Sequence, residues 1–421
     1  MLVVALLGAL ACGDDDGATF DGGAEDGGVD AFVADGGVDA PAEPDAGFDA
    51  AFDSATDAFR PDRSRFIEGI RPGNAWQDVT ASLGANLEID PSAVSYSGGG
   101  TANARTVVLG GGHNNGFNDA VAILDWRAFE STGWYEEFPS TADVLGVDDR
   151  DYAAIADALH ANYDPATPGG FRAFGGRAGG ALSRHTYDHV VVMDDAFYIF
   201  GGILPFDNPG QGAAPWGNTE ADIWRYDFGV GWTYLDQYRT GYHEGHGAAA
   251  LDTRTGRIWF HDYEELRAWD PDTGEYANTG TYLNGQSIES SLNFNPDEGD
   301  QGTLFGGGNY GGDDWWEYDI ATGRETSMGR IPGSRHSTYI YYVPAEYGAS
   351  YGTYFATVPA DGTLRRWTGD AWETIASGGP STDDYVYGRT GFEPHHGVFY
   401  WIHHPYTSGG WQTWVVRPFS L

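Results

Sequence analysis

The sequence of 421 residues contains no lysine, a single cysteine and only three methionines. Its 22 basic residues are all arginine and stand against 62 acidic residues, which gives a formal net charge of −40. Without a basic stripe to neutralise phosphates, we expect no binding to nucleic acid. Because Cys12 is the only cysteine, the sequence excludes an internal disulfide, a cysteine-based zinc site and a cysteine nucleophile in the folded part.

Long apolar runs are also missing: none reaches 18 residues, so we expect no membrane-spanning helix. The phosphate-binding, dinucleotide-binding and serine-hydrolase glycine motifs are absent as well. The chain is instead rich in turn formers and strand formers, with 63 glycines, 15 tryptophans and 25 tyrosines. This composition is typical of an all-β protein. The arginine-, alanine- and glycine-rich usage without lysine is associated with high-GC bacterial genomes.

The N-terminus has the pattern of an export signal. Residues 1–11 form an apolar run that ends in small residues directly before Cys12. This pattern resembles a bacterial lipoprotein signal, which implies lipidation of Cys12, export, and a place at the outer membrane or cell surface. No basic residue precedes the run, so an upstream start codon and an ordinary cleaved secretory signal stay open as alternatives.

Residues 13–65 follow as a linker in which Asp, Gly and Ala predominate. The first 46 of them carry 12 Asp and 2 Glu and no basic residue. Such a segment cannot bury enough apolar surface to offset its ordering entropy, so we predict a disordered acidic tail that acts as a spacer. The expected organisation is a signal and anchor over 1–12, this linker over 13–65 and a folded domain over 66–421.

The folded domain contains an internal repeat. A strand that ends in an aromatic residue or Leu recurs near Leu109, Phe200, Phe260, Phe305, Phe355 and Trp401. Each instance is followed by a second and usually a third strand, and preceded by a short apolar one. Four short strands per unit predict a β-propeller, here with six blades. The sixth unit lacks its fourth strand, and residues 74–79 match residues 370–375, so an N-terminal strand is expected to close the last blade.

The glycine motifs of the repeat suggest a family. Gly110-Gly111-Gly112 precedes Asn118-Asp119, and Phe200-Gly201-Gly202 ends the corresponding strand of the next unit. These motifs resemble the kelch repeats, including the propeller of galactose oxidase, although three units lack the double glycine. Another type of propeller stays open. The copper-radical chemistry of galactose oxidase needs a tyrosine crosslinked to a cysteine, which Cys12, outside the propeller, cannot supply.

Propeller connectivity assigns the loops to two faces. We call the face with the blade-to-blade connections, conventionally the upper one, the connection face, and the opposite one the hairpin face. Two long insertions, 139–182 with an expected helix over 149–162, and 203–220, fall on the connection face. We expect both above blade two, where they would form a wall or lid.

Most histidines also map to the connection face. The motif Ser-Arg-His occurs in blades two and five, and Arg389 takes the corresponding place in blade six. The candidate ligand-binding residues are His113, Arg184, His185, Tyr187, His189, His243, His246, Arg335, His336 and Arg389. Of these, His185, His246 and His336 are candidate metal ligands for Zn or Cu, and the acidic clusters 148–151 and 297–300 could hold Ca. None of these cofactors is required by a motif.

Three uses of such a face are open. Aromatic, Arg and Asp side chains suit the recognition of a carbohydrate or protein ligand, which we favour. His, Tyr and Arg together could perform lyase chemistry on an acidic polysaccharide. Converging imidazoles could form a metal-dependent enzyme. We therefore expect an exported, monomeric binding protein rather than an enzyme, with the lipid at Cys12 as its only membrane contact.

Overall fold

The chain divides into two compact units, residues 1–58 and 59–421, and all described residues belong to the second. The structure is a computed structural model, and it describes residues 63–87, 97–111, 117–162, 179–184, 186, 188–202, 222–237, 247–261, 265–282, 291–307, 314–333, 338–381, 389–403 and 410–420. Cys12 and the predicted linker up to residue 62 lie outside this part. Among the described residues, no helix has both the length and the apolarity needed to span a membrane.

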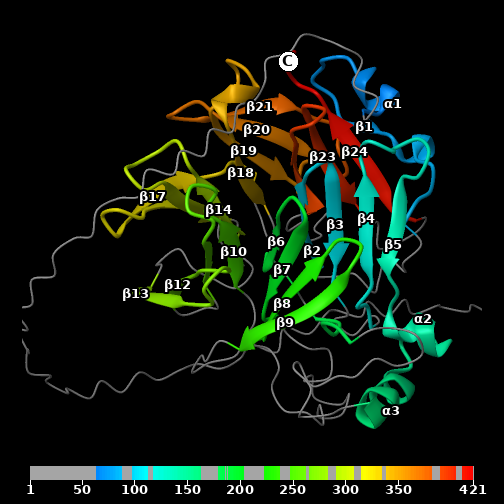
Figure 1. Ribbon diagram of the computed structural model, residues 1–421. Helices are drawn as coiled ribbons and strands as arrows, with labels where there is room; N and C mark the ends of the chain where they lie inside the picture. The colour runs from blue at the N-terminus through cyan, green and yellow to red at the C-terminus, as the bar shows by residue number, and fades with distance from the viewer. Residues whose placement is uncertain are drawn as a thin grey trace, which may run out of the picture. The chain divides into compact units, whose positions relative to one another are not determined.

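The second unit is a six-bladed β-propeller, as predicted: six antiparallel sheets of four strands each surround a central axis (Figure 1). The inner strands of blades one to six are β2 (Gly98–Ala102), β6 (Val190–Val192), β10 (Ala248–Leu251), β14 (Ser291–Asn295), β18 (Tyr339–Val343) and β22 (Thr390–Glu393). The second strands are β3 (Arg105–Leu109), β7 (Ala196–Phe200), β11 (Ile258–His261), β15 (Thr303–Gly307), β19 (Thr353–Val358) and β23 (Val398–His403).

The third strands in the same order are β4 (Val121–Asp125), β8 (Asp222–Asp227), β12 (Glu265–Trp269), β16 (Asp314–Asp319), β20 (Thr363–Trp367) and β24 (Gln412–Val416). The outer strands are β5 (Trp134–Phe138), β9 (Gly231–Gln237), β13 (Tyr276–Tyr282), β17 (Arg324–Arg330), β21 (Trp372–Ala376) and β1 (Gln77–Asp78). The helices are α1 (Arg65–Glu68), α2 (Thr141–Leu145) and α3 (Tyr152–Asn162), with short 3-10 turns at Thr80–Ser82 and Ala345–Tyr347. The connection face points downward in Figure 1, where β5 leads into α2.

The core lies between the blades. Side chains alternate along each strand, so successive residues contact different neighbouring blades. Val107 of β3 packs with blade two, while the next residue, Val108, packs with blade six. Six such clusters, one for each pair of adjacent blades, account for most of the buried apolar side chains of the described residues. Because the two sides of a blade are both covered, its second strand is almost continuously apolar, as in β7 and β23.

An N-terminal strand closes the ring, as predicted. β1 pairs with β24 in antiparallel register, Gln77 opposite Val415. The preceding helix α1 is held on the hairpin face by buried polar groups: Arg417 donates four hydrogen bonds of 2.8–3.1 Å to backbone carbonyls, three of them in residues 67–70. The imidazole of His396, between Glu393 (2.8 Å) and the backbone N–H of Ser64 (3.1 Å), completes this clasp.

The turns on the hairpin face use aspartate in a repeated way. Asp252, Asp270 and Asp319 each end or follow a strand and accept hydrogen bonds of 2.9–3.2 Å from backbone N–H groups two or three residues ahead. A glycine with positive φ closes each turn four residues after the aspartate. Carboxylate-capped turns of this kind fix a hairpin locally, without help from the rest of the fold.

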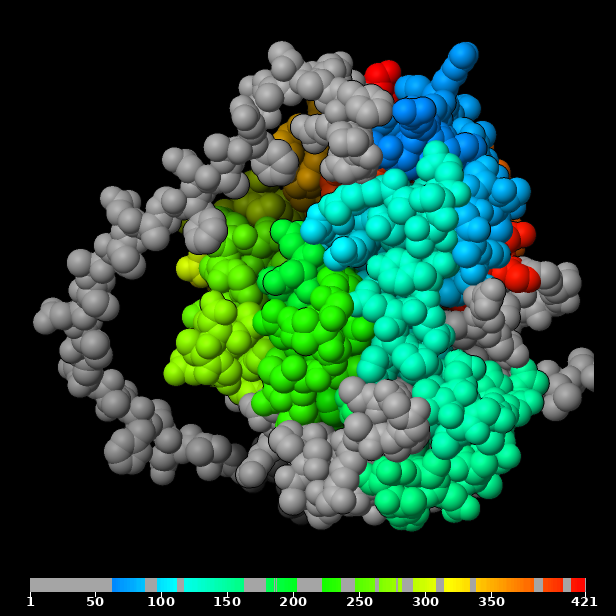
Figure 2. Space-filling view, turned by 45° about the vertical axis from the view of Figure 1, so that its right-hand side comes forward, coloured from blue at the N-terminus to red at the C-terminus, as the bar shows by residue number. Residues whose placement is uncertain are grey.

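The first insertion does not lie where we expected. α2 and α3 pack beside blade one, not above blade two, through a small core of Phe117, Ile155, Leu159 and neighbours. The reason is a pair of contacts to the loop before β4: Asp119 accepts hydrogen bonds from the backbone N–H (2.6 Å) and the hydroxyl (2.7 Å) of Thr141. The expected helix over 149–162 is confirmed as α3, which begins at Tyr152. Residues of α2 and α3 form a projection beyond the end of blade one (Figure 2). The second insertion, 203–220, lies outside the described residues.

Candidate functional site

The structure describes three of the ten candidate ligand-binding residues, Arg184, His189 and Arg389. The other candidates fall outside the described part of the chain: His113, His185, Tyr187, His243, His246, Arg335 and His336. The three candidate metal ligands are among them. Within the described ranges, no group of three His, Asp or Glu side chains is placed to hold a metal ion. The metal hypothesis therefore stays a prediction about residues 185, 246 and 336.

Arg184 lies inside the protein, with 1% of its surface exposed. Its guanidinium donates to the carbonyl of Leu182 (3.1 Å) and to that of Gly201 (3.0 Å), which follows β7. Its positive charge also acts on Asp222 at the start of β8, where burial nonetheless raises the pKa of the carboxyl to about 6. These contacts fix the connection end of blade two. A direct contact between Arg184 and a ligand stays a prediction that this burial does not support.

His189 and Arg389 precede the inner strands of blades two and six and are fully buried. The Nε2 atom of His189 lies 3.4 Å from the carbonyl oxygen of His261, and burial lowers the pKa of the His261 imidazole to about 4. The guanidinium carbon of Arg389 lies 5.9 Å from the ring centre of Trp411, a cation–π distance. His189 therefore packs between blades two and three, and Arg389 packs within blade six, both at the connection end of the ring.

Asp188, which follows the Ser-Arg-His motif of blade two, bonds to residues on the other side of the axis. Its carboxylate accepts a hydrogen bond of 2.7 Å from the backbone N–H of Leu292 in blade four and another from the hydroxyl of Tyr339 in blade five. Its own carbonyl accepts from the N–H of Ala249 in blade three (2.8 Å). Burial raises the pKa of Asp188 well above its usual range. One aspartate thus joins blades two to five across the axis.

We call Asp188 and the groups bonded to it the axial hub. The neighbouring Thr186 connects this hub to blade one. Its hydroxyl oxygen accepts from the N–H of Gly98, at the start of β2, and donates to the carbonyl of Leu109 (3.0 Å). The inner strands have no strand partner on their axial side, so their first N–H groups need such acceptors. The segment that starts with the Ser-Arg-His motif of blade two therefore contains Arg184, which fixes the end of that blade, and Thr186 and Asp188, which join it to other blades.

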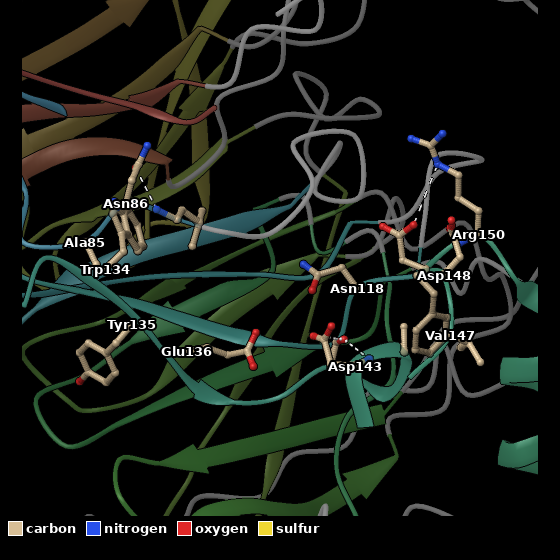
Figure 3. A pocket seen from close by; sticks show the side chains of 15 residues that line it. Ala85, Asn86, Asn118, Trp134, Tyr135, Glu136, Asp143, Val147, Asp148 and Arg150 are labelled. Atoms are coloured by element: carbon tan, nitrogen blue, oxygen red, sulfur yellow. Dashed lines mark hydrogen bonds and ion pairs between the residues drawn. The ribbon is translucent and has the colours of Figure 1, made fainter. Parts of the chain in front are cut away.

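A cavity of about 750 Å³ lies at the outer edge of blade one, toward the connection face. It is enclosed by β5, by the segment 85–87 that precedes the inner strand of blade one, and by the insertion from α2 to Arg150. Asn118, Glu136 and Asp143 lie in the middle of the view, between Trp134 with Asn86 at one end and Asp148 with Arg150 at the other (Figure 3). This volume is within the range of small-ligand sites.

The lining of this blade-one cavity is acidic and partly aromatic. Its described ionisable residues are Glu136, Asp143, Asp148 and Asp149 with one cation, Arg150, whose Nε lies 4.0 Å from Asp149. Two of the acids also serve local structure: Asp143 accepts a 2.6 Å hydrogen bond from Ser140, the N-cap of α2, and Asp148 accepts from the N–H of Arg150. Sequence reasoning missed this site, because it weighed the acidic cluster only as a calcium ligand.

The chain was compared with known proteins. No family model and no curated protein sequence matches it. The described structure therefore defines the class, a six-bladed β-propeller, and the kelch resemblance stays a hypothesis based on the glycine motifs.

Proposed function

We propose that this protein is an exported, lipid-anchored binding protein that recognises a carbohydrate through the connection face, at the blade-one cavity. The observation that carries the proposal is the lining of that cavity. Carboxylate and amide oxygens accept hydrogen bonds from sugar hydroxyls, and the buried Trp134 closes one end of the cavity with an apolar ring. A protein ligand is the other candidate partner for loops carried on a rigid scaffold.

The charge of the cavity limits the class of carbohydrate that it can bind. The described lining has four carboxylates and one arginine, and the whole chain has a net charge of −40. This excess of negative charge repels acidic polymers. A uronic-acid polymer, which the lyase hypothesis requires, is therefore the least suited ligand at this place. Neutral and amine-bearing glycans fit it better.

Anchoring belongs to the same proposal. The first described residues of the folded unit, Arg63 to Glu68, lie on the hairpin face beside His396 and Arg417. Lipidation is tested by metabolic labelling with a fatty acid: we expect label in the parent protein and none in Cys12→Ser, whereas equal labelling of both would refute the anchor.

The binding proposal is tested with the full-length Cys12→Ser chain on an array of neutral, amine-bearing and acidic glycans. We expect binding to the first two classes, weakened roughly tenfold to a hundredfold by Glu136→Gln, because a hydrogen bond to a charged group is lost. The matched control is Glu325→Gln, on the outer strand β17 of blade four, which should bind like the parent. Absence of glycan binding, or equal effects of the two substitutions, would overturn the proposal.

A further inference from the structure

A second cavity, of about 390 Å³, lies along the propeller axis. Residues from all six inner strands line it, among them Gly100, Val191, Ala250 and Asn293. It is separate from the blade-one cavity, with which it shares no described lining residue. We call it the channel cavity.

Hydrogen bonds span the channel cavity at one end, and surface turns line it at the other. At the connection end, the hydrogen bonds of Asp188 to Leu292 and Tyr339 span the axis. At the hairpin end, the lining includes the turn residues Thr253, Pro296, Pro344 and Pro394. The three prolines follow the inner strands of blades four to six at equivalent positions. Because proline has a fixed φ, they make this rim rigid.

The described lining of the channel cavity contains no charged side chain, in contrast to the rest of this acidic chain. The tyrosine hydroxyls are engaged by the protein: Tyr342 donates to Asp297 (2.6 Å), and Tyr341 lies 3.1 Å from the hydroxyl of Thr357. What such tyrosines offer a ligand is the face of the ring. A charged molecule would lose its hydration here without meeting an opposite charge.

The polar groups available to a ligand come from the backbone. Each inner strand pairs on one side only, with the second strand of its blade, so alternate N–H and C=O groups point toward the axis. A few are bonded within the protein, such as the carbonyl of Ile340, which accepts from Asn293 (2.7 Å). Buried backbone groups need hydrogen-bond partners. Hydroxyl groups, which both donate and accept, match a mixed row of this kind.

We infer that the channel cavity is a binding site for one small, uncharged, hydroxylated molecule, of the size of one or two sugar rings, that enters from the hairpin face. Ring faces of the tyrosines contact its C–H groups, and the strand edges bond its hydroxyls. This site is independent of the proposed glycan recognition at blade one, which takes place at the opposite face.

The test is isothermal titration of the full-length Cys12→Ser, Glu136→Gln chain, in which the proposed blade-one site is weakened, with maltose as the neutral probe and with glucosamine and glucuronate as charged probes. We expect saturable one-to-one binding of maltose and at least tenfold weaker binding of both charged probes. Because Glu136 is already replaced, the maltose binding that remains reports on the channel cavity, which separates the two sites. Absence of saturable maltose binding, or equal affinity for a charged probe, would overturn the inference.

A substitution at the rim locates the site. Thr253→Trp places a large ring at the mouth, and we expect it to weaken maltose binding at least tenfold. Ala321→Trp, in an exposed turn at the outer side of blade four, is the matched control and should bind like the parent. Hydrogen exchange of β14 and β18 with and without maltose gives a second readout: protection of these strands is expected, and protection confined to blade one would refute the channel site.

Discussion

Three carboxylates at opposite faces of the propeller have contrasting environments. On the hairpin face, the side chain of Asp270 is 28% exposed, and the N–H groups of Asp272 and Thr273 lower the pKa of its carboxyl. On the connection face, burial raises the pKa of Asp188 and of Asp222. An exposed carboxylate in a turn stabilises its hairpin at little cost, while a buried one costs free energy as long as it is charged.

This difference indicates where the fold is optimised for stability and where it carries another constraint. Buried ionisable groups with shifted pKa values concentrate at functional sites more often than in purely structural regions. The connection face holds Asp188, Asp222 and His261, and it is also the face of the blade-one cavity. The hairpin face, by contrast, is built from repeated local turns and from the clasp around α1.

The largest expected effect compares one buried arginine from each face. Arg417→Met keeps the aliphatic stem but removes the donors of four backbone carbonyls, so we expect a loss of about 3–5 kcal/mol in the free energy of unfolding. Arg184→Met removes the donors of two carbonyls and should cost less. Urea denaturation of both variants measures the order. A larger loss of stability for Arg184→Met than for Arg417→Met would show that the connection face contributes more to the stability of the fold.

The second prediction concerns the axial hub. Asp188→Ala leaves the N–H of Leu292 and the hydroxyl of Tyr339 without their acceptor, and we expect it to lower the free energy of unfolding by about 2–3 kcal/mol. Asp188→Asn keeps one acceptor oxygen for these two donors and should cost less. The same denaturation measurement applies. Equal losses for the two variants would show that the hydrogen bonds of Asp188 do not matter.

The blades could be predicted from the sequence because their patterns are local, whereas the contacts at the connection face could not. Each blade has strands that end in an aromatic residue or Leu, and this local pattern recurs along the chain. The six blades and the closing strand 74–79 could therefore be predicted from the sequence. The role of Asp188 could not be predicted, because its partners Leu292 and Tyr339 are more than 100 residues away in the chain. The role of Asp119 could not be predicted either: its contact with Thr141, 22 residues further on, holds the insertion at blade one, where the cavity lies.

The third prediction is a pH dependence on the connection face. The pKa of Asp222 is about 6 in the folded protein and about 4 in an unfolded chain. The folded state therefore holds the proton more tightly, and its contribution to stability, present below pH 4, is lost as the pH rises to 6. Asp222→Asn should remove a loss of the order of 2 kcal/mol.

The readout for Asp222 is the difference between variant and parent, measured by urea denaturation at pH 4, 5, 6 and 7. The difference matters because His261, with a pKa of about 4, works in the opposite direction: its neutral folded form makes stability rise with pH up to about 6.5. We expect Asp222→Asn to gain on the parent between pH 4 and 6 and to run parallel above. Curves that run parallel over the whole range would contradict the raised pKa.

The smallest effect is expected on the hairpin face, at Asp270. Because backbone N–H groups lower its pKa, its contribution to stability is present above the usual aspartate pKa of about 4 and is lost only below it. Asp270→Asn keeps an acceptor oxygen for the N–H groups of Asp272 and Thr273, so the melting temperature should change by no more than about 2 °C between pH 5 and 8. Thermal unfolding at pH 3, 5 and 8 checks this. A pH-dependent gain like that of Asp222→Asn would mean that a carboxylate is costly on either face. The contrast between the faces would then reflect burial of the charge alone and not a constraint specific to the connection face.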